Sequence, residues 1–313
     1  MKPISDYIVE RIRVDNISMD TLPEDLKNKY KLIYNPDTML YDCDDGITIN
    51  ADLIEDGRFK CNFGVIKGNF NCNNCNLLTS LKGAPKEVGG NFNCSYCNSL
   101  TSLKGTPKEV GWDFYCGHCN SLKTLEGAPK EVGRNFLCLG CKNLTSLEGA
   151  PKEVSGDFNC SDCESLTSLE GAPEKVGGDF ICGNCKSLKS LEGAPKGVGQ
   201  DFYCNNCDSL TSLEGASKQV GRSFSCGYCG SLTSLKGAPK GVDGNFYCNE
   251  CDSLTSLEGA PKKVGWDFDC SWCNSLTSLE GAPNEVGWDF DCKRCPNLKN
   301  HNIKTKIGGK FIK

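Results

Sequence analysis

The residues in this chain that are best suited to chemistry are its cysteines. Of the 24 cysteines, 22 form eleven C-x-x-C pairs, which run from Cys72/Cys75 to Cys292/Cys295, and each pair follows the previous one by 22 residues. Each junction reads C-x2-C-x18-C-x2-C, a spacing that is typical of zinc sites. Three states are therefore open: reduced thiols in a core, disulfides between neighbouring repeats, or thiolates on a metal ion or cluster.

The repetition itself favours reduced, structural thiols. All ten overlapping junctions match the zinc spacing, which a structural repeat requires and a single site does not, and pairing eleven repeats leaves one over. The segment from Met1 to Asp6 lacks the apolar region of a secretory signal. We therefore expect a cytoplasmic protein, in which disulfides are the second interpretation. Because all eleven C-x-x-C pairs have nearly the same sequence context, a single redox-active cysteine with a lowered pKa is not expected. We also expect no bound metal and no cofactor.

Composition and charge exclude several classes of function. The two histidines, His118 and His301, leave little room for general acid–base catalysis. We find no phosphate-binding loop, no H-E-x-x-H and no serine–histidine constellation. The 35 basic and 40 acidic residues give a formal charge of −5, which makes no basic field for nucleic acid, and no apolar stretch is long enough to span a membrane. The chain is predicted not to be an enzyme.

The cysteines belong to one repeated unit, G-[ND]-F-x-C-x-x-C-x-S-L-T-S-L-[EK]-G-A-P-K-x-V-G. A unit of 22 residues is too short to bury a core alone, so neighbouring units must stack as a solenoid. The F-x-C segment alternates with period two, which predicts a short strand with Phe and Cys inward and x outward. Glycines and the Gly-Ala-Pro segment predict the turns. In one unit the apolar positions are Phe158, Cys160, Cys163, Leu166, Leu169 and Val176.

A solenoid exposes apolar faces at its two ends, so caps are expected there. We predict an N-terminal capping segment over residues 1–67, a repeat solenoid over 68–298 and a C-terminal cap over 299–313. Apolar spacing favours a helix over residues 4–14, and a second short helix is predicted to start within residues 22–25. A degenerate F-x-C, Phe59-Lys60-Cys61, is expected to lead into the sheet. The residues expected to close the C-terminal core are Ile303, Ile307, Phe311 and Ile312.

The pattern V-x-x-x-F-x-C-x-x-C-x-x-L-x-x-L resembles the leucine-rich repeat, with one extra residue in two places. The string LTSLEGAPKEV looks like the bacterial type of that repeat, and the tandem units are similar to uncharacterised repeat proteins of large bacteriophages and giant viruses. The resemblance implies a mainly β, leucine-rich-repeat-like solenoid of eleven 22-residue coils with a small N-terminal α+β cap. A curved horseshoe and a straighter β-solenoid both remain open.

Function is expected at the positions that vary among the eleven units. These are the residue between Phe and Cys, the two residues inside C-x-x-C, the residue after it, and the residue two before Phe. Many of the aromatic residues outside the core occupy these positions, and Trp, Tyr and Arg are enriched at binding hot spots. The predicted partner-binding residues are Trp266, Trp272, Trp288, Tyr247, Tyr228, Tyr203, Trp112 and Tyr115.

Acidic residues accompany the last tryptophans, so we expect one aromatic patch ringed by acid, with Asp267, Asp269, Asp289 and Asp291 around it. The alternative is that Trp only covers the sheet edge or packs on the next coil. The recurring Lys and Glu after Pro are expected to form a solvated flank in which opposite columns compensate. Recurring Asp before Phe suggests Ca²⁺ only weakly, because close-set oxygen ligands are missing.

The first functional hypothesis is a non-enzymatic repeat scaffold that binds another protein through its variable face. The resemblance implies a phage or bacterial protein that acts on a host factor in the cytoplasm. A structural spacer or virion component is the second hypothesis, and a thiol-rich metal-binding protein is the third. Neither nucleic acid nor membrane is expected as a partner.

Overall fold

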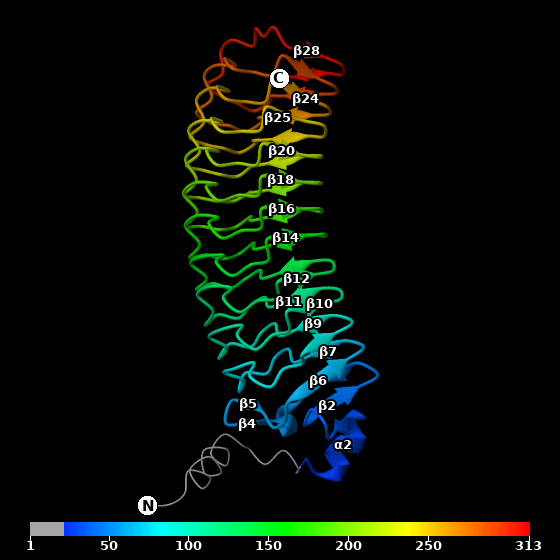
Figure 1. Cartoon of the computed structure of the whole chain (residues 1–313). Helices are drawn as coiled ribbons and strands as arrows, with labels where there is room; N and C mark the ends of the chain where they lie inside the picture. Colours follow the sequence, from blue (N-terminus) through cyan, green and yellow to red (C-terminus); the bar gives the residue numbers. More distant parts are fainter. Residues whose placement is uncertain (1–21) are drawn as a thin grey trace, which may run out of the picture.

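The computed structural model describes residues 22–313, which form an elongated parallel β-solenoid of about twelve turns of about 22 residues (Figure 1). The prediction of a mainly β solenoid is confirmed. Within the described residues, the helices are α2 (Glu24–Tyr30) and the short 3₁₀ helix η2 (Ala51–Leu53), and both belong to the N-terminal region. The predicted helix over residues 4–14 lies outside the described residues. The coils stack into a long column without a helical side, which favours the straighter β-solenoid.

One sheet, here called the Phe sheet, runs the length of the column with thirteen parallel strands in register. Each repeat contributes the Phe and the residue after it. From β7 to β27 the Phe side chains are fully buried and the next residue is mostly half-buried, as the period-two pattern predicts. From β7 to β27, successive Phe rings lie 4.9–5.6 Å apart. The strands are β3 (Ile47–Thr48), β7 (Phe70–Asn71), β9 (Phe92–Asn93), β11 (Phe114–Tyr115), β13 (Phe136–Leu137), β15 (Phe158–Asn159), β17 (Phe180–Ile181), β19 (Phe202–Tyr203), β21 (Phe224–Ser225), β23 (Phe246–Tyr247), β25 (Phe268–Asp269), β27 (Phe290–Asp291) and β29 (Phe311–Ile312).

A second set of strands, here called the Val sheets, contains the K-x-V segment, for which the sequence pattern predicts only a buried Val. It forms sheets of six, four and four strands, and the six-stranded sheet also contains β1 and β2. In each two-residue strand the Val or Ile faces the core and the residue before it faces outward. The repeat strands are β6 (Phe63–Ile66), β8 (Glu87–Val88), β10 (Glu109–Val110), β12 (Glu131–Val132), β14 (Glu153–Val154), β16 (Lys175–Val176), β18 (Gly197–Val198), β20 (Gln219–Val220), β22 (Gly241–Val242), β24 (Lys263–Val264), β26 (Glu285–Val286) and β28 (Lys306–Ile307).

The three Val sheets are separated at the two coils in which the residue after Val is not glycine. Where Gly follows the Val, it donates its amide N–H to the Val carbonyl of the previous coil, as Gly133 does to Val110 at 3.0 Å. A Cβ atom at Gly133 would collide with the carbonyl oxygen of Gly111. Two coils have Ser155 and Asp243 at this position, and there β12 does not pair with β14 and β20 does not pair with β22. A side chain here therefore separates neighbouring coils.

The N-terminal region closes the lower end of the column. Strand β1 (Ile33–Asn35) pairs antiparallel with β2 (Leu40–Cys43), and β2 continues in parallel into β6. Helix α2 lies at this end (Figure 1), which confirms the predicted helix start. The buried Tyr30 donates its hydroxyl to Asp52 Oδ1 at 2.6 Å and so ties α2 to η2.

Phe59-Lys60-Cys61 leads directly into β6 of the first Val sheet, as expected, but it is not an F-x-C strand of the Phe sheet. Phe59 lies in a short antiparallel hairpin of β4 (Ile54–Glu55) and β5 (Arg58–Phe59), 22 residues before Leu81 and thus at the position of the second leucine. Its ring packs edge-on against Phe63 and Phe70. The strand that precedes β7 in the Phe sheet is β3, so the stack begins before residue 68. At the other end, Ile303, Ile307 and Phe311 pack against the core as predicted, and Ile312 is half-buried in β29.

Candidate functional sites

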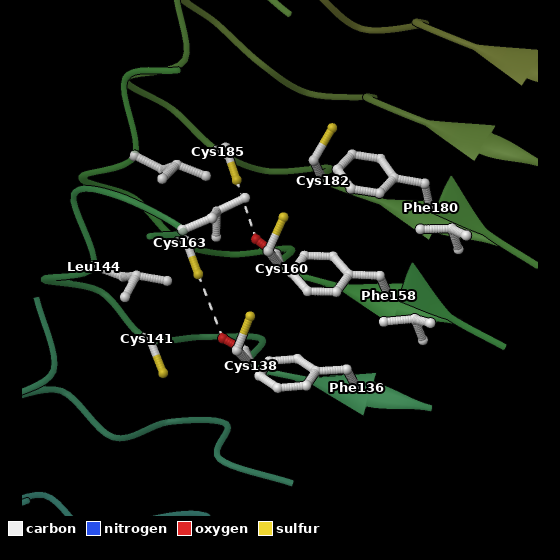
Figure 2. Packing of buried hydrophobic residues seen from close by; sticks show 14 of the residues in the cluster. Phe136, Cys138, Cys141, Leu144, Phe158, Cys160, Cys163, Phe180, Cys182 and Cys185 are labelled. Atoms are coloured by element: carbon white, nitrogen blue, oxygen red, sulfur yellow. Dashed lines mark hydrogen bonds between the residues drawn. The ribbon is translucent and has the colours of Figure 1, made fainter. Parts of the chain in front are cut away.

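The cysteines line the interior of the column beside the Phe rings (Figure 2). All 24 are free thiols and all are buried. The second cysteine of each pair donates its S–H to the backbone carbonyl of the first cysteine one coil earlier, as Cys185 does to Cys160 at 3.3 Å. The ten junctions from Cys97 to Cys295 all have this bond, at 3.1–3.5 Å. Each second thiol therefore satisfies a buried carbonyl oxygen.

This hydrogen bond explains why each repeat has two cysteines at a fixed spacing. The sequence pattern alone did not predict it. The first cysteine ends the strand, and its carbonyl oxygen accepts a thiol of the coil above. The only signal in the sequence is the constant offset of 25 residues between donor and acceptor, which has meaning only once the coil path is known. Cysteine supplies both a small apolar volume and a weak donor, which Ala or Val would not combine.

Burial raises the pKa of most of the thiols, whereas a hydrogen bond with Cys72 lowers the pKa of Cys97 and one with Cys207 lowers that of Cys229. Burial raises the pKa of Cys185 to about 12 and that of Cys273 to about 12, while that of Cys141 rises to about 11. A thiol with such a pKa is neutral near pH 7, and the neutral form is neither the nucleophile nor the metal ligand. Across residues 22–313, no group of three or more His, Cys, Asp or Glu is placed to hold a metal ion.

The two cysteines of one pair provide a matched test of this hydrogen bond. Cys182 and Cys185 are both fully buried, and only Cys185 donates a hydrogen bond that the structure records. Both changes to Ala remove packing, but Cys185→Ala also leaves the Cys160 carbonyl unsatisfied. We expect Cys185→Ala to lower the free energy of unfolding by about 1 kcal/mol more than Cys182→Ala does. Urea unfolding of both variants measures this difference, and equal losses would contradict the role assigned to the bond.

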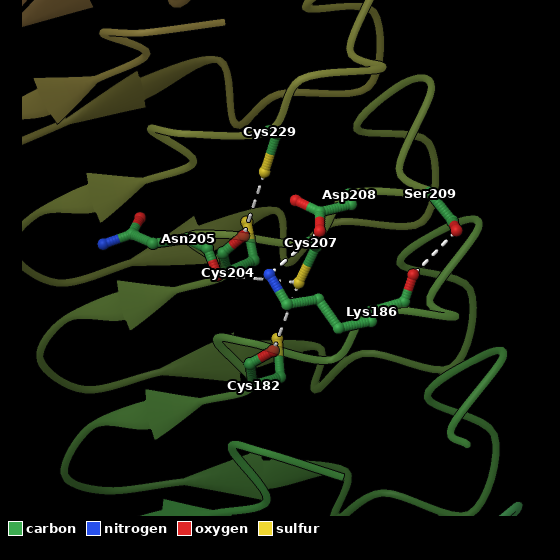
Figure 3. A network of polar contacts seen from close by, with 8 residues as sticks. All are labelled: Cys182, Lys186, Cys204, Asn205, Cys207, Asp208, Ser209 and Cys229. Carbon is green, nitrogen blue, oxygen red and sulfur yellow. Dashed lines mark hydrogen bonds and ion pairs between the residues drawn. The ribbon is translucent and has the colours of Figure 1, made fainter. Parts of the chain in front are cut away.

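The outer flank of the same coils is joined by polar contacts (Figure 3). Lys186 pairs with Asp208 at 2.9 Å, and Ser209 Oγ donates to the Lys186 carbonyl at 2.7 Å. Inside the column, Cys207 donates to the Cys182 carbonyl at 3.4 Å. The exposed ion pair contributes little to stability, so the interior holds the coils together.

The acidic residues before Phe form a structural ladder. Asp179 donates its backbone N–H to Asp157 Oδ1 at 2.8 Å, and Asp201 donates its N–H to Asp179 Oδ1 at 2.9 Å. Asn245 and Ser223 fill the same position, where Asn245 N–H donates to Ser223 Oγ at 3.1 Å. A neutral side-chain oxygen accepts this bond as well as a carboxylate does. The column is therefore explained by the need to pair a backbone N–H in each coil, and the Ca²⁺ interpretation gains no support.

The predicted aromatic residues occupy two columns rather than one cluster. Trp266 and Trp288 precede their strands, and their rings stack at 5.8 Å while remaining 40% and 60% exposed. Trp272 follows its strand, in the left-handed backbone region, and carries the Arg294 guanidinium 4.6 Å above its ring. The strand β25 separates the two columns along the chain. Asp267 and Asp289 are half-buried and accept backbone N–H groups, so they are committed to the ladder.

The other predicted partner-binding residues differ in exposure. Trp112 lies under the Arg134 guanidinium at 5.1 Å and is 48% exposed, and Tyr228 is 46% exposed. Tyr115 and Tyr203 are half-buried and donate their hydroxyls to Asp113 and Asp201. Tyr247 is also half-buried. His118 stacks on Tyr96 at 4.5 Å and extends the column that contains Trp272.

These observations define a class of protein: a tandem-repeat parallel β-solenoid with a Phe and Cys core and aromatic residues on its outer columns. Compared with protein-family models, with curated proteins and with solved structures, the chain gives no match. The resemblance to leucine-rich repeats and to phage proteins stays a prediction. The helices within residues 22–313 are all too short or too polar to cross a membrane.

Proposed function

We propose that the chain is a non-enzymatic scaffold that binds another protein through exposed aromatic residues beside the strands of the Phe sheet. The observation that carries this proposal is the stacked pair Trp266 and Trp288, here called the Trp pair, whose rings lie outside the core. Tryptophan contributes large, rigid contact area when a partner covers it, and it is the residue most enriched at hot spots. Stacking holds the two rings in place, so binding orders little that is not already ordered.

Two features support a role without catalysis. Burial raises the pKa of most of the thiols, Cys185 among them, so these carry little thiolate at neutral pH, and the His118 ring stacks on Tyr96. A phage or bacterial origin, and action on a host factor in the cytoplasm, remain part of the proposal on the basis of the sequence resemblance alone.

The Trp pair can be tested by capture with the immobilised full chain. We expect Trp266→Ala with Trp288→Ala to reduce capture of the partner from a lysate at least tenfold, since two hot-spot rings are lost. The matched control is Trp112→Ala, which changes the same position of an earlier coil and should keep the partner. Trp272→Ala tests the other column separately. Far-ultraviolet circular dichroism checks that each variant is folded. Undiminished capture by the double variant would refute the site.

The alternative is a structural spacer or virion component, which the length and regularity of the column favour (Figure 1). A chain that captures no protein and that self-associates in sedimentation would support this alternative over binding. The thiol-rich metal-binding alternative requires thiolates, and the thiol–carbonyl bonds and raised pKa values oppose it.

A further inference from the structure

A groove of about 1260 Å³ runs along the outer face of the first Val sheet, within residues 65–155. It is lined by the Pro-Lys-Glu-Val-Gly segments of successive coils, well before the Trp pair in the chain. One set of lining residues, here called the Lys column, consists of Lys86, Lys108, Lys130 and Lys152. A second, the Glu column, consists of Glu87, Glu109, Glu131 and Glu153.

The charges in this groove are unpaired within the described chain. None of the eight side chains forms an ion pair or a side-chain hydrogen bond with residues 22–313, and all eight are exposed. Elsewhere on the column, opposite charges on neighbouring coils do pair. Lys104 lies 2.8 Å from Glu126, and Lys236 lies 2.9 Å from Glu214. The expected compensation between opposite columns is therefore absent in the groove.

Each column also stacks like charges in register. Glu109 lies directly opposite Glu131 in the β10–β12 pair, and like charges in that position are destabilising. The pattern ends at the next coil, where Glu174 and Lys175 reverse the two signs and Lys196 pairs with Glu174. The Lys position continues in later coils, as at Lys218 and Lys240, but there no Glu column lies beside it. A Lys column beside a Glu column is thus confined to the coils that form the groove, where a partner that carries both charges would relieve the repulsion.

We propose that this groove binds an amphipathic helix of another protein that carries an acidic stripe beside a basic stripe. The Lys column repeats with the coil spacing of about 4.8 Å, which places its four positions at about 0, 4.8, 9.6 and 14.4 Å. Helix positions i, i+3, i+7 and i+10 share one face and lie at about 0, 4.5, 10.5 and 15 Å. Acidic side chains at these positions match the Lys column to within about 1 Å. A neighbouring basic stripe meets the Glu column.

The spacing of the Lys column favours a helix over two other occupants. A helix of about eleven residues spans about 16 Å, close to the distance of about 14.4 Å over which the four lysine positions repeat. The side chains on one face of a strand repeat at about 6.7 Å, so they lose register with the columns within two coils. In a symmetric dimer, the groove of one copy would face the groove of the other and leave unfilled space. Such a gap is unfavourable because protein interiors are closely packed.

A synthetic helix tests the proposal with the full chain. The probe is a fluorescent, end-capped, alanine-based peptide of about 15 residues with Glu at i, i+3, i+7 and i+10 and Lys at i+1, i+4, i+8 and i+11. Its control has the same composition with the charges scrambled, so that no stripe forms. We expect anisotropy to show binding of the striped peptide that weakens with salt, and at least tenfold weaker binding of the scrambled one.

Variants of the chain locate the binding. Lys108→Gln with Lys130→Gln should weaken the striped peptide about tenfold, whereas Lys218→Gln with Lys240→Gln, at the same position of later coils, should not. The Trp pair variant should bind the peptide as the wild type does. A negative result for the groove can therefore be told apart from a negative result for the Trp pair. Equal binding of both peptides, no effect of the groove variant, or a homodimer that the groove variant dissociates would each overturn the proposal.

Discussion

Raising the pH from 7.5 to 10 is expected to unfold the solenoid. The free thiol has a pKa of about 8.5 in an unfolded chain, whereas burial raises the pKa of Cys185 and of Cys273 to about 12 in the folded chain. The buried thiol therefore stabilises the folded state fully below about pH 8.5. That contribution is lost as the pH rises toward the folded pKa, because the unfolded chain releases the proton first.

The repetition makes this effect large. At pH 9.5, one such thiol lowers the free energy of unfolding by about 1.4 kcal/mol, and ten thiols lower it by about 14 kcal/mol, which equals the whole stability of an ordinary domain. Circular dichroism and thiolate absorbance, followed together under a reductant, should change in one transition. Below pH 10, ionisation of tyrosine contributes less than that of cysteine, since tyrosine in the unfolded chain has a pKa of about 10 and keeps most of its protons below that pH.

A cysteine-depleted variant provides the control. Replacing Cys160, Cys182 and Cys204 by Ala removes three titrating thiols, so the dependence of stability on pH should become shallower by about three protons. These are the first cysteines of their pairs. Cys160 and Cys182 donate no hydrogen bond that the structure records, and Cys204 donates its S–H to the Ser225 carbonyl at 3.4 Å. A folded spectrum at pH 10, or a transition whose slope is unchanged in this variant, would contradict the thiol account.

Gly193→Ala is expected to destabilise its coil strongly. Gly193 has φ of +87°, a conformation that side chains rarely adopt, and its Cβ would collide with backbone atoms of Leu169 and Glu170 in the coil before. Strain and overpacking together should lower the free energy of unfolding by about 3 kcal/mol or more. Because repeat proteins are held by neighbouring contacts, we also expect thermal unfolding to split into two transitions, one for each side of the strained coil.

Gly230→Ala is the matched control. No heavy atom lies within 4 Å of a Cβ built at Gly230, and its φ lies outside the positive range. The same chemical change should therefore leave the free energy of unfolding within about 0.5 kcal/mol of the wild type. Equal effects of the two substitutions in differential scanning calorimetry would contradict the close coil-to-coil contact at Gly193.

The repeat period and the alternation of F-x-C were enough to predict the solenoid, its Phe sheet and the buried thiols, because both follow from local chemistry. The Val sheets could not be predicted, since a two-residue strand with one inward Val has no periodicity. The breaks at Ser155 and Asp243 depend on how closely neighbouring backbones approach, which no pattern reports. Phe59 was expected at the Phe position of a repeat but lies at the position of the second leucine. The pattern could not distinguish the two, because aromatic and leucine side chains both fill core volume.

The sequence predicted which residues belong to the candidate sites but not how they are arranged in space. Exposure of Trp266, Trp272 and Trp288 follows from their variable positions, whereas their division into two columns depends on the width of the strand between them. The Lys and Glu columns are visible in the sequence. That they lack ion pairs depends on side-chain geometry, and the groove depends on the coil path.

The cysteines are expected to be reduced residues of the core, and a paired assay tests this most directly. Free thiols are counted in native and in denatured protein, and metals are measured by elemental analysis of the same sample. We predict about 24 reactive thiols after denaturation, very few before it, and no stoichiometric metal. Few thiols in the denatured chain, or several zinc or iron atoms per chain, would contradict it.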